Sequence, residues 1–266
     1  MSDPTAAVPT TALPLPGGGQ MPLVGFGTWR LLGQGAVDAT RWALAAGYRH
    51  LDTATMYANQ AEVGQALRAS GVPRDDVFVT TKLPPDRVAE PRAVLEESLT
   101  ELGLDQVDLW LVHWPPPGDD TALWRDFVAA RDEGVVRDIG VSNYSLEQVD
   151  RLVESVGVLP AVNQVPWSPL SFDRAVLDGH RARGVVLEGY STLRGGTLTR
   201  PVVVAIAARL GRTPAQVLVR WHVQHEVVVI PRSSQRERVV ANADVDGFAL
   251  SAADMAALDA LGVTPA

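Results

Sequence analysis

The segment Val227-Val228-Val229-Ile230 is apolar at four successive positions, and this pattern decides the fold class. A strand with one face in water alternates apolar and polar residues, whereas a strand of a parallel sheet is buried on both faces and does not alternate. Val77-Phe78-Val79 shows the same pattern. Similar short segments recur along the chain with helical patterns between them. This order predicts an α/β protein with a parallel sheet.

Working outward from these segments gives eight predicted strands: Leu23–Gly27, Tyr48–Thr53, Val77–Lys82, Val107–His113, Asp138–Ser142, Ala161–Val165, Val185–Tyr190 and Val227–Pro231. Predicted helices between them include Ala36–Ala46, Arg92–Leu102 and Leu123–Asp132. Eight strands with intervening helices in ~250 residues are typical of a (β/α)8 barrel. We therefore expect a single barrel domain over residues 13–266. An open doubly wound sheet is the alternative, but Gly25-Phe26-Gly27 lacks the third glycine of the dinucleotide-binding motif Gly-x-Gly-x-x-Gly.

The segments outside the predicted barrel elements are also informative. Residues 1–12 lack the positive charge that begins a secretory signal, so we expect a flexible tail. Pro16-Gly-Gly-Gly-Gln20 is typical of a turn and predicts a short hairpin at the bottom of the barrel.

Helix starts carry their own signals. Capping boxes are predicted from two Ser-x-x-Gln/Glu patterns, and a capped start from one Thr-Pro pair: Ser145 with Gln148, Ser234 with Glu237, and Thr213-Pro214.

Composition excludes several classes of protein. Of 266 residues, 46% are hydrophobic, which is enough for a sizeable core and argues against disorder. The absence of cysteine excludes disulfides, thiolate zinc sites and iron–sulfur clusters, and favours a cytoplasmic protein. A net charge of −8 argues against nucleic-acid binding. No apolar run reaches the ~18–20 residues that a membrane span needs. His222 and His225 lack a third ligand, so no metal site is predicted.

Chemically useful side chains stand where predicted strands end. Lysine and arginine total 23 residues, yet Lys82 is the only lysine. Asp52, Lys82 and His113 end the second, third and fourth predicted strands, and Tyr57 follows in the loop after Asp52. Because the carboxyl ends of barrel strands meet at one rim, where such barrels have their active sites, these four residues are predicted to converge.

Together these four side chains suit the reduction of a carbonyl, which needs a hydride on carbon and a proton on oxygen. Free tyrosine has a pKa of ~10, and we expect the Lys82 ammonium to lower that of Tyr57. Asp52 would keep the ammonium charged, and His113 would orient the substrate oxygen. Two alternatives remain open: a lyase that forms a Schiff base on Lys82, and a protein that binds a cofactor without turnover.

Three spaced motifs resemble the aldo-keto reductase family, over about Gln20 to Leu261. They are Gly47-Tyr-Arg-His-Leu-Asp52-Thr-Ala-Thr-Met-Tyr57 with Val63-Gly64; Ile139-Gly-Val-Ser142-Asn143-Tyr144; and Ile230-Pro-Arg232-Ser233 with Arg238 and Asn242. The resemblance is to the small bacterial members typified by 2,5-diketo-D-gluconate reductases. It implies a catalytic tetrad of Asp52, Tyr57, Lys82 and His113, with Tyr57 as the general acid. It also implies NADPH as cofactor, a small aldehyde or ketone as substrate, and a monomer.

The resemblance further implies a set of cofactor contacts: Gly27, Thr28, Asp52, Ser142, Asn143, Gln164, Tyr190, Ser191, Leu193, Arg232, Ser233, Ser234, Arg238 and Asn242. Among these, Tyr190 would stack on the nicotinamide ring, and Arg232 and Arg238 would hold the 2′-phosphate of NADPH. Trp29 and Trp114 would wall the substrate, beside Tyr57 and His113. The loops after His113 and Tyr190 are short, so we expect a shallow pocket with weak discrimination.

Overall fold

The computed structural model describes residues 11–262, and the first ten residues of the predicted tail lie outside this range. Eight parallel strands form one sheet in the order β10-β9-β8-β7-β6-β5-β4-β3. They are β3 (Phe26–Gly27), β4 (His50–Asp52), β5 (Phe78–Leu83), β6 (Val107–Val112), β7 (Val136–Ser142), β8 (Val162–Pro166), β9 (Val186–Tyr190) and β10 (Val228–Val229). Val24 forms a parallel bridge with Val229, and the Gly25 N–H donates to the Val229 carbonyl at 2.8 Å. These contacts join the two ends of the sheet, consistent with the predicted (β/α)8 fold.

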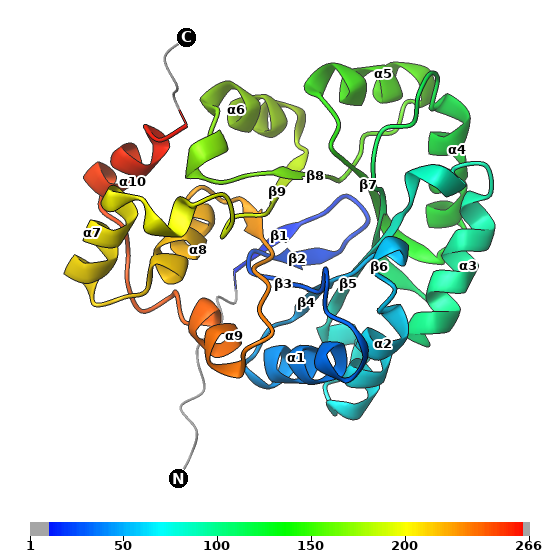
Figure 1. Ribbon diagram of the computed structural model, residues 1–266. Coiled ribbons are helices and arrows are strands. Elements are labelled where there is room, and N and C mark those ends of the chain that lie inside the picture. The colour runs from blue at the N-terminus through cyan, green and yellow to red at the C-terminus, as the bar shows by residue number, and fades with distance from the viewer. Residues whose placement is uncertain (1–10, 263–266) are drawn as a thin grey trace.

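Helices surround this sheet (Figure 1). They are α1 (Gly33–Ala45), α2 (Gln60–Ala69), α3 (Pro91–Leu102), α4 (Thr121–Asp132), α5 (Leu146–Val156), α6 (Arg174–Arg183), α7 (Pro201–Leu210), α8 (Pro214–Gln224), α9 (Arg236–Ala243) and α10 (Ala252–Asp259). Both α7 and α8 lie between β9 and β10, and α9 and α10 follow β10. Within residues 11–262, no single helix has both the length and the apolar composition to cross a membrane, although α7 and α8, bent by 93° at their junction, would have them as a pair.

Core packing explains why apolar and polar residues do not alternate along the strands. In β6, Leu109 and Leu111 belong to a core cluster with Val228, while Trp110 belongs to a second cluster beneath the helices. Trp110 stacks on Phe127 of α4, with ring centroids 3.7 Å apart. Successive side chains of a strand point to opposite faces, and here both faces are covered by protein.

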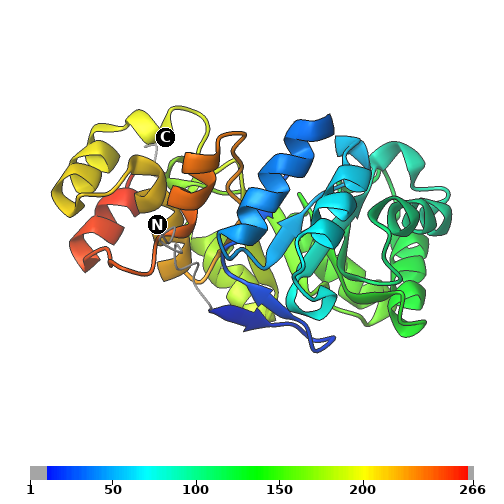
Figure 2. The same cartoon turned by 90° about the horizontal axis from the view of Figure 1, so that it is seen from below.

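The predicted N-terminal hairpin is present. Strands β1 (Ala12–Pro14) and β2 (Gln20–Pro22) pair antiparallel, so the hairpin begins at Ala12, one residue before the predicted domain start. The Gly17 N–H donates to Asp138 Oδ1 at 2.6 Å, and Met21 packs in one cluster with Phe78. Phe78 and Asp138 lie near the starts of β5 and β7, so the hairpin covers the N-terminal end of the sheet (Figure 2).

Two of the three predicted helix starts are confirmed. Ser145 and Thr213 each form a capping box, at α5 and α8. The prediction at Ser234 is wrong, because α9 begins at Arg236 without a side-chain cap. The Ser233 hydroxyl instead accepts the Gln235 N–H at 3.0 Å, so the chain is still turning at Ser234 and the helix begins later.

Candidate functional site

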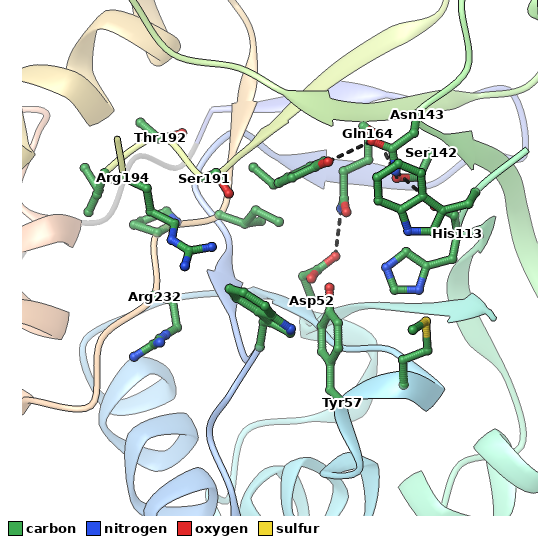
Figure 3. A pocket seen from close by; sticks show the side chains of 18 residues that line it. Asp52, Tyr57, His113, Ser142, Asn143, Gln164, Ser191, Thr192, Arg194 and Arg232 are labelled. Carbon is green, nitrogen blue, oxygen red and sulfur yellow. Dashed lines mark hydrogen bonds between the residues drawn. The ribbon is translucent and has the colours of Figure 1, made fainter. Parts of the chain in front are cut away.

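A cavity of about 430 Å³ lies at the C-terminal ends of the strands (Figure 3). Most of the predicted site residues line it: Gly27, Trp29, Asp52, Tyr57, His113, Trp114, Ser142, Asn143, Gln164, Tyr190, Ser191, Leu193 and Arg232. They come from the ends of β3, β4, β7, β8 and β9, and from the loops that follow these strands and β6 and β10. The convergence that the strand pattern predicted is therefore present.

Lys82 is fully buried behind the cavity, and its ammonium connects two of the predicted catalytic side chains. Its Nζ donates to Asp52 Oδ2 at 2.6 Å, to the Thr53 carbonyl at 2.8 Å and to the Tyr57 hydroxyl at 3.3 Å. Asp52 and Lys82 lie on neighbouring strands, and a short 3-10 helix after β4, Thr55–Tyr57, brings the phenol back over the ammonium. Each N–H of the ammonium therefore has an acceptor.

The net shift of the Lys82 pKa bears on the lyase alternative. Burial lowers the pKa of this amine, but the neighbouring Asp52 carboxylate and the Tyr57 phenol outweigh burial and leave it raised. A Schiff base forms from the neutral amine, so this environment disfavours a lyase.

Lys82 does not lower the net pKa of Tyr57, contrary to the expectation from the sequence. The ammonium does lower the pKa of Tyr57, but burial has the larger, opposite effect, and the net value rises to about 12. The expectation of a lowered pKa is therefore wrong in its net sign. The phenol is protonated at neutral pH, as a proton donor must be.

His113 faces Tyr57 across the cavity, with ring centroids 5.8 Å apart in an edge-on arrangement. Burial, helped by the Lys82 charge, lowers the pKa of His113 to about 3. The imidazole is therefore neutral near pH 7 and carries a single N–H. Its Nδ1 atom has no hydrogen-bond partner within residues 11–262. A neutral ring of this kind can donate one hydrogen bond to a carbonyl oxygen in the cavity.

Polar side chains at the ends of β7, β8 and β9 form a second connected group. The Gln164 amide donates to Asp52 Oδ2 at 2.8 Å, the contact drawn as a dashed line in Figure 3. Ser142 Oγ donates to the Gln164 carbonyl at 2.8 Å, and the Tyr190 hydroxyl donates to Asn143 Oδ1 at 2.7 Å. These bonds hold a hydroxyl, two amides and an aromatic ring in place, which suits recognition of a planar ligand that carries its own amide.

Backbone strain gathers at the cavity. Asn143 and Ser191 have φ values of 65° and 61°, and Arg30, beside Trp29, has 62°. A side chain other than glycine in this region costs of order 1–3 kcal/mol, and such residues cluster where ligands bind. Of the five such residues in the described part of the chain, Asn143 and Ser191 line the cavity, Arg30 and Ala58 each adjoin a lining residue, and Glu226 lies between α8 and β10. Strain is therefore present at the candidate site, though not confined to it.

One side of the cavity carries arginines that have no carboxylate partner. The guanidinium groups of Arg30 and Arg194 lie 4.4 and 4.7 Å from the centre of the Trp29 ring. Arg194 and Arg232 line the cavity on the same side (Figure 3). In the part of the chain that the structure describes, none of the three arginines forms a salt bridge. In a protein of net charge −8, this side of the cavity suits an anionic ligand.

Some predicted contacts lie away from the cavity wall. Thr28 is buried, where its hydroxyl donates to the Asp52 carbonyl at 2.9 Å, and Ser233 and Asn242 are buried as well. Ser234 and Arg238 are exposed beyond the lined region. Conversely, the cavity is also lined by residues that were not among the predicted contacts: Met56, Ile230 and Pro231, which stand in the quoted motifs, and Thr192 and Arg194. Only their position in the sequence could have indicated them, because each is next to a predicted site residue or to another residue of this set.

The remaining predictions concern metals. Among residues 11–262, no three His, Asp or Glu side chains are grouped so that they could hold a metal ion. His222 instead contacts the Leu218 carbonyl through Nδ1 at 2.9 Å, and His225 pairs with Asp259 at 2.8 Å.

Comparisons with known proteins agree with this geometry. The model of the Aldo/keto reductase family matches residues 23–263. An aldo-keto reductase of Mycolicibacterium smegmatis is 41% identical over 92% of this chain and 90% of its own length. The methylglyoxal reductase DkgA of Salmonella typhimurium is 38% identical over 90% of this chain and 89% of its own.

Among solved structures, an aldo/keto reductase from Brucella melitensis superposes with a TM-score of 0.88 and 37% identity, over 96% of this chain and 100% of that one. The aldose reductase of Schistosoma japonicum gives a TM-score of 0.88 and 33% identity, over 94% and 91%.

Proposed function

Because this chain belongs to the aldo/keto reductase family, and is therefore an oxidoreductase that acts on carbonyl compounds, we propose that it reduces aldehydes and ketones with NADPH and that Tyr57 donates the proton. The observation that carries the proposal is the Lys82 ammonium, which bonds both Asp52 and Tyr57 at the wall of one cavity. We further propose that the enzyme is cytoplasmic and acts as a monomer.

The residues around the cavity fit NADPH at both of its ends. Gln164, Asn143 and Ser142 present amides and a hydroxyl that suit the nicotinamide carboxamide, and Tyr190 offers an aromatic face. On the opposite side, the salt-bridge-free guanidinium groups of Arg194 and Arg232 suit phosphate groups. When bound, NADPH supplies the hydride.

In this proposal each residue of the tetrad has a separate task. Tyr57 is protonated at neutral pH and gives its proton to the substrate oxygen. Lys82 stabilises the phenolate that remains, because its ammonium stands 3.3 Å from the phenol oxygen. Asp52 holds the ammonium charged. Neutral His113 donates a hydrogen bond that fixes the angle of the carbonyl.

The rim of the cavity supports a small, partly apolar substrate. Trp29, Met56 and Trp114 are large apolar side chains that line the cavity and remain 38%, 56% and 45% exposed. The chain reaches α4 directly after Asp120, so the loop behind Trp114 is short. A small aldehyde such as methylglyoxal, which the related Salmonella enzyme is named for, would fit this rim. We expect weak discrimination between similar aldehydes.

The test is NADPH consumption with a panel of small aldehydes and ketones, in the wild type and in Tyr57→Phe. The phenylalanine ring keeps the packing and removes the proton, so kcat should fall by about 10²–10⁴-fold while the Kd for NADPH stays unchanged. Full turnover in Tyr57→Phe would show that another group donates the proton. A wild type that binds NADPH but reduces no carbonyl would instead favour a non-catalytic cofactor binder.

A further inference from the structure

Glu188 is a buried acid for which the mechanism above has no use. It lies in β9 two residues before Tyr190, so both side chains point to the same face of the sheet. The register places it beside Gln164 of β8 and Val228 of β10. It is fully buried, and within residues 11–262 neither of its carboxyl oxygens meets hydrogen-bond geometry, although the Gln164 side chain lies near enough to lower its pKa in part.

The groups that face Glu188 give it no compensating charge. The nearest is His50 of β4, whose Nε2 is 3.8 Å from Glu188 Oε1. Burial lowers the pKa of His50 to about 4, so this ring is neutral at pH 7. Lys82 of β5 directs its three donors to Asp52, Thr53 and Tyr57 instead. A carboxylate at this place would be a buried charge without a partner, which proteins avoid by keeping the proton.

Charges of the tetrad act on Glu188, and Glu188 acts on them. Burial, followed by the charge of Asp52, raises the pKa of Glu188 to about 8, and Gln164 and Lys82 oppose this only in part. In the other direction, a negative charge on Glu188 raises the pKa of both Tyr57 and Lys82. A chain of contacts connects the two side chains: Glu188 lies beside Gln164 in the sheet, the Gln164 amide donates to Asp52 Oδ2 at 2.8 Å, and Lys82 bonds both Asp52 and the Tyr57 hydroxyl. A charge on Glu188 can therefore act on the phenol without direct contact.

We propose that Glu188 is a positioning residue of the reduction: it is a neutral acid in the active enzyme, and when it releases its proton to solvent the added negative charge beside Asp52 and Lys82 makes Tyr57 a poorer proton donor. The effect on rate rests on the proposed function, whereas the presence of the proton does not. The two parts are tested separately.

The first experiment detects the proton without any turnover. An infrared pH titration of the wild type, compared with Glu188→Gln, should show a protonated carboxyl band at pH 7 that disappears near pH 8 and is missing from the variant. A carboxylate band at pH 7 that is lost in the variant would overturn the proposal. This result does not depend on substrate, so it stands even if the proposed carbonyl reduction fails.

The second experiment is the pH profile of kcat for NADPH-dependent reduction of an aldehyde by the wild type and Glu188→Gln. The amide has the size of the acid but cannot ionise, so both proteins should have equal kcat near pH 6.5. One pH unit above the pKa of Glu188, where only about one side chain in eleven keeps its proton, the variant should be faster than the wild type, by up to about tenfold if the ionised form is inactive. Glu188→Met, which cannot ionise either, should show the same alkaline behaviour if the amide variant does not fold.

The matched control is Asp138→Asn. Asp138 is another buried carboxyl with a raised pKa, caused mainly by burial, but it bonds the hairpin at the opposite end of the sheet. Its pH profile should follow the wild type. Superimposable profiles for the wild type and Glu188→Gln would overturn the positioning role, as would a loss of kcat in Glu188→Gln that is equal at every pH.

Discussion

Lys82 has three N–H donors, and the fold supplies each of them with an oxygen acceptor. A guanidinium in this place would be larger and planar, and could not direct single bonds to a carboxylate, a carbonyl and a phenol in this geometry. This explains why a chain that otherwise uses arginine for its cations has lysine at position 82. The site therefore depends on one compact charge, the Lys82 ammonium, which is fully buried.

The arginines of the cofactor side should differ in what they recognise. Arg194 lines the cavity beside Trp29, whereas Arg238 is exposed on α9, after β10. We expect Arg194→Ala to raise the KM for NADPH and for NADH alike, by about tenfold, because it would contact phosphates that both cofactors carry. Arg238→Ala should raise the KM for NADPH alone, since NADH lacks the 2′-phosphate.

Steady-state KM values for both cofactors measure this difference, with Arg200→Ala as the control. Arg200 is exposed directly before α7 and lies outside the cavity lining. An unchanged NADPH/NADH ratio in Arg238→Ala would remove Arg238 from the 2′-phosphate site. An effect of Arg194→Ala on NADPH alone would place the 2′-phosphate at Arg194 instead.

At the scale of elements, part of the first sequence motif serves packing rather than chemistry. Gly64 lies in α2, and a Cβ added there would come within 2.1 Å of the Leu102 carbonyl at the end of α3. The contact is with backbone, which cannot rotate away as a side chain could. The glycine therefore sets how closely α2 approaches α3, which in turn packs on β5.

Gly64→Ala should destabilise the protein by about 1–3 kcal/mol through overpacking, with little effect on kcat of the folded enzyme. Urea unfolding measures the loss. Gly35→Ala is the matched control, because Gly35 is also helical, in α1, and an added Cβ there meets nothing within 4 Å. That change should be neutral or stabilising by about 0.5–1 kcal/mol. Equal stability in the two variants would contradict the close contact.

At the scale of the whole molecule, buried histidines link folding to pH. Burial lowers the pKa of His50 and of His222 to about 4 in the folded protein, from an ordinary value of 6.5. Above pH 6.5 both rings are neutral in the folded and unfolded states, so their contribution to stability is fully present. As the pH falls from 6.5 towards 4, the unfolded chain binds protons that the folded chain does not, and stability is lost.

His113, with its lowered pKa, adds to this loss, whereas Glu188, whose pKa is raised, binds its proton more tightly in the folded protein and gains stability over the same range. For the balance, we expect the free energy of unfolding to fall by on the order of 2–4 kcal/mol between pH 7 and pH 5. Urea unfolding at several pH values measures this slope. His222→Gln removes one titrating ring and should make the slope shallower, whatever it does to stability at pH 7. A variant slope as steep as that of the wild type would mean that other groups cause the acid sensitivity.

The parallel sheet could be predicted from the sequence, because strands such as Val227–Ile230, which are apolar at every position, are buried only when both faces of the sheet are covered. The sequence also determined that Asp52, Lys82 and His113 share one rim, since parallel strands place their carboxyl ends together. These inferences follow from local pattern and strand direction alone, and the cavity brings the same residues together with Tyr57.

Quantities that depend on distant neighbours could be obtained only from the folded arrangement. Burial against the charge of Lys82 sets the net pKa of Tyr57, and that balance has no local signal. The lack of a hydrogen-bond partner for Glu188 also has no local signal, because it results from side chains on four other strands. Arg194 and Met56 line the cavity because of the conformation of their loops, which the sequence pattern does not give. Desolvation and loop direction are sums over contacts between segments far apart in sequence, so spacing along the chain cannot supply them.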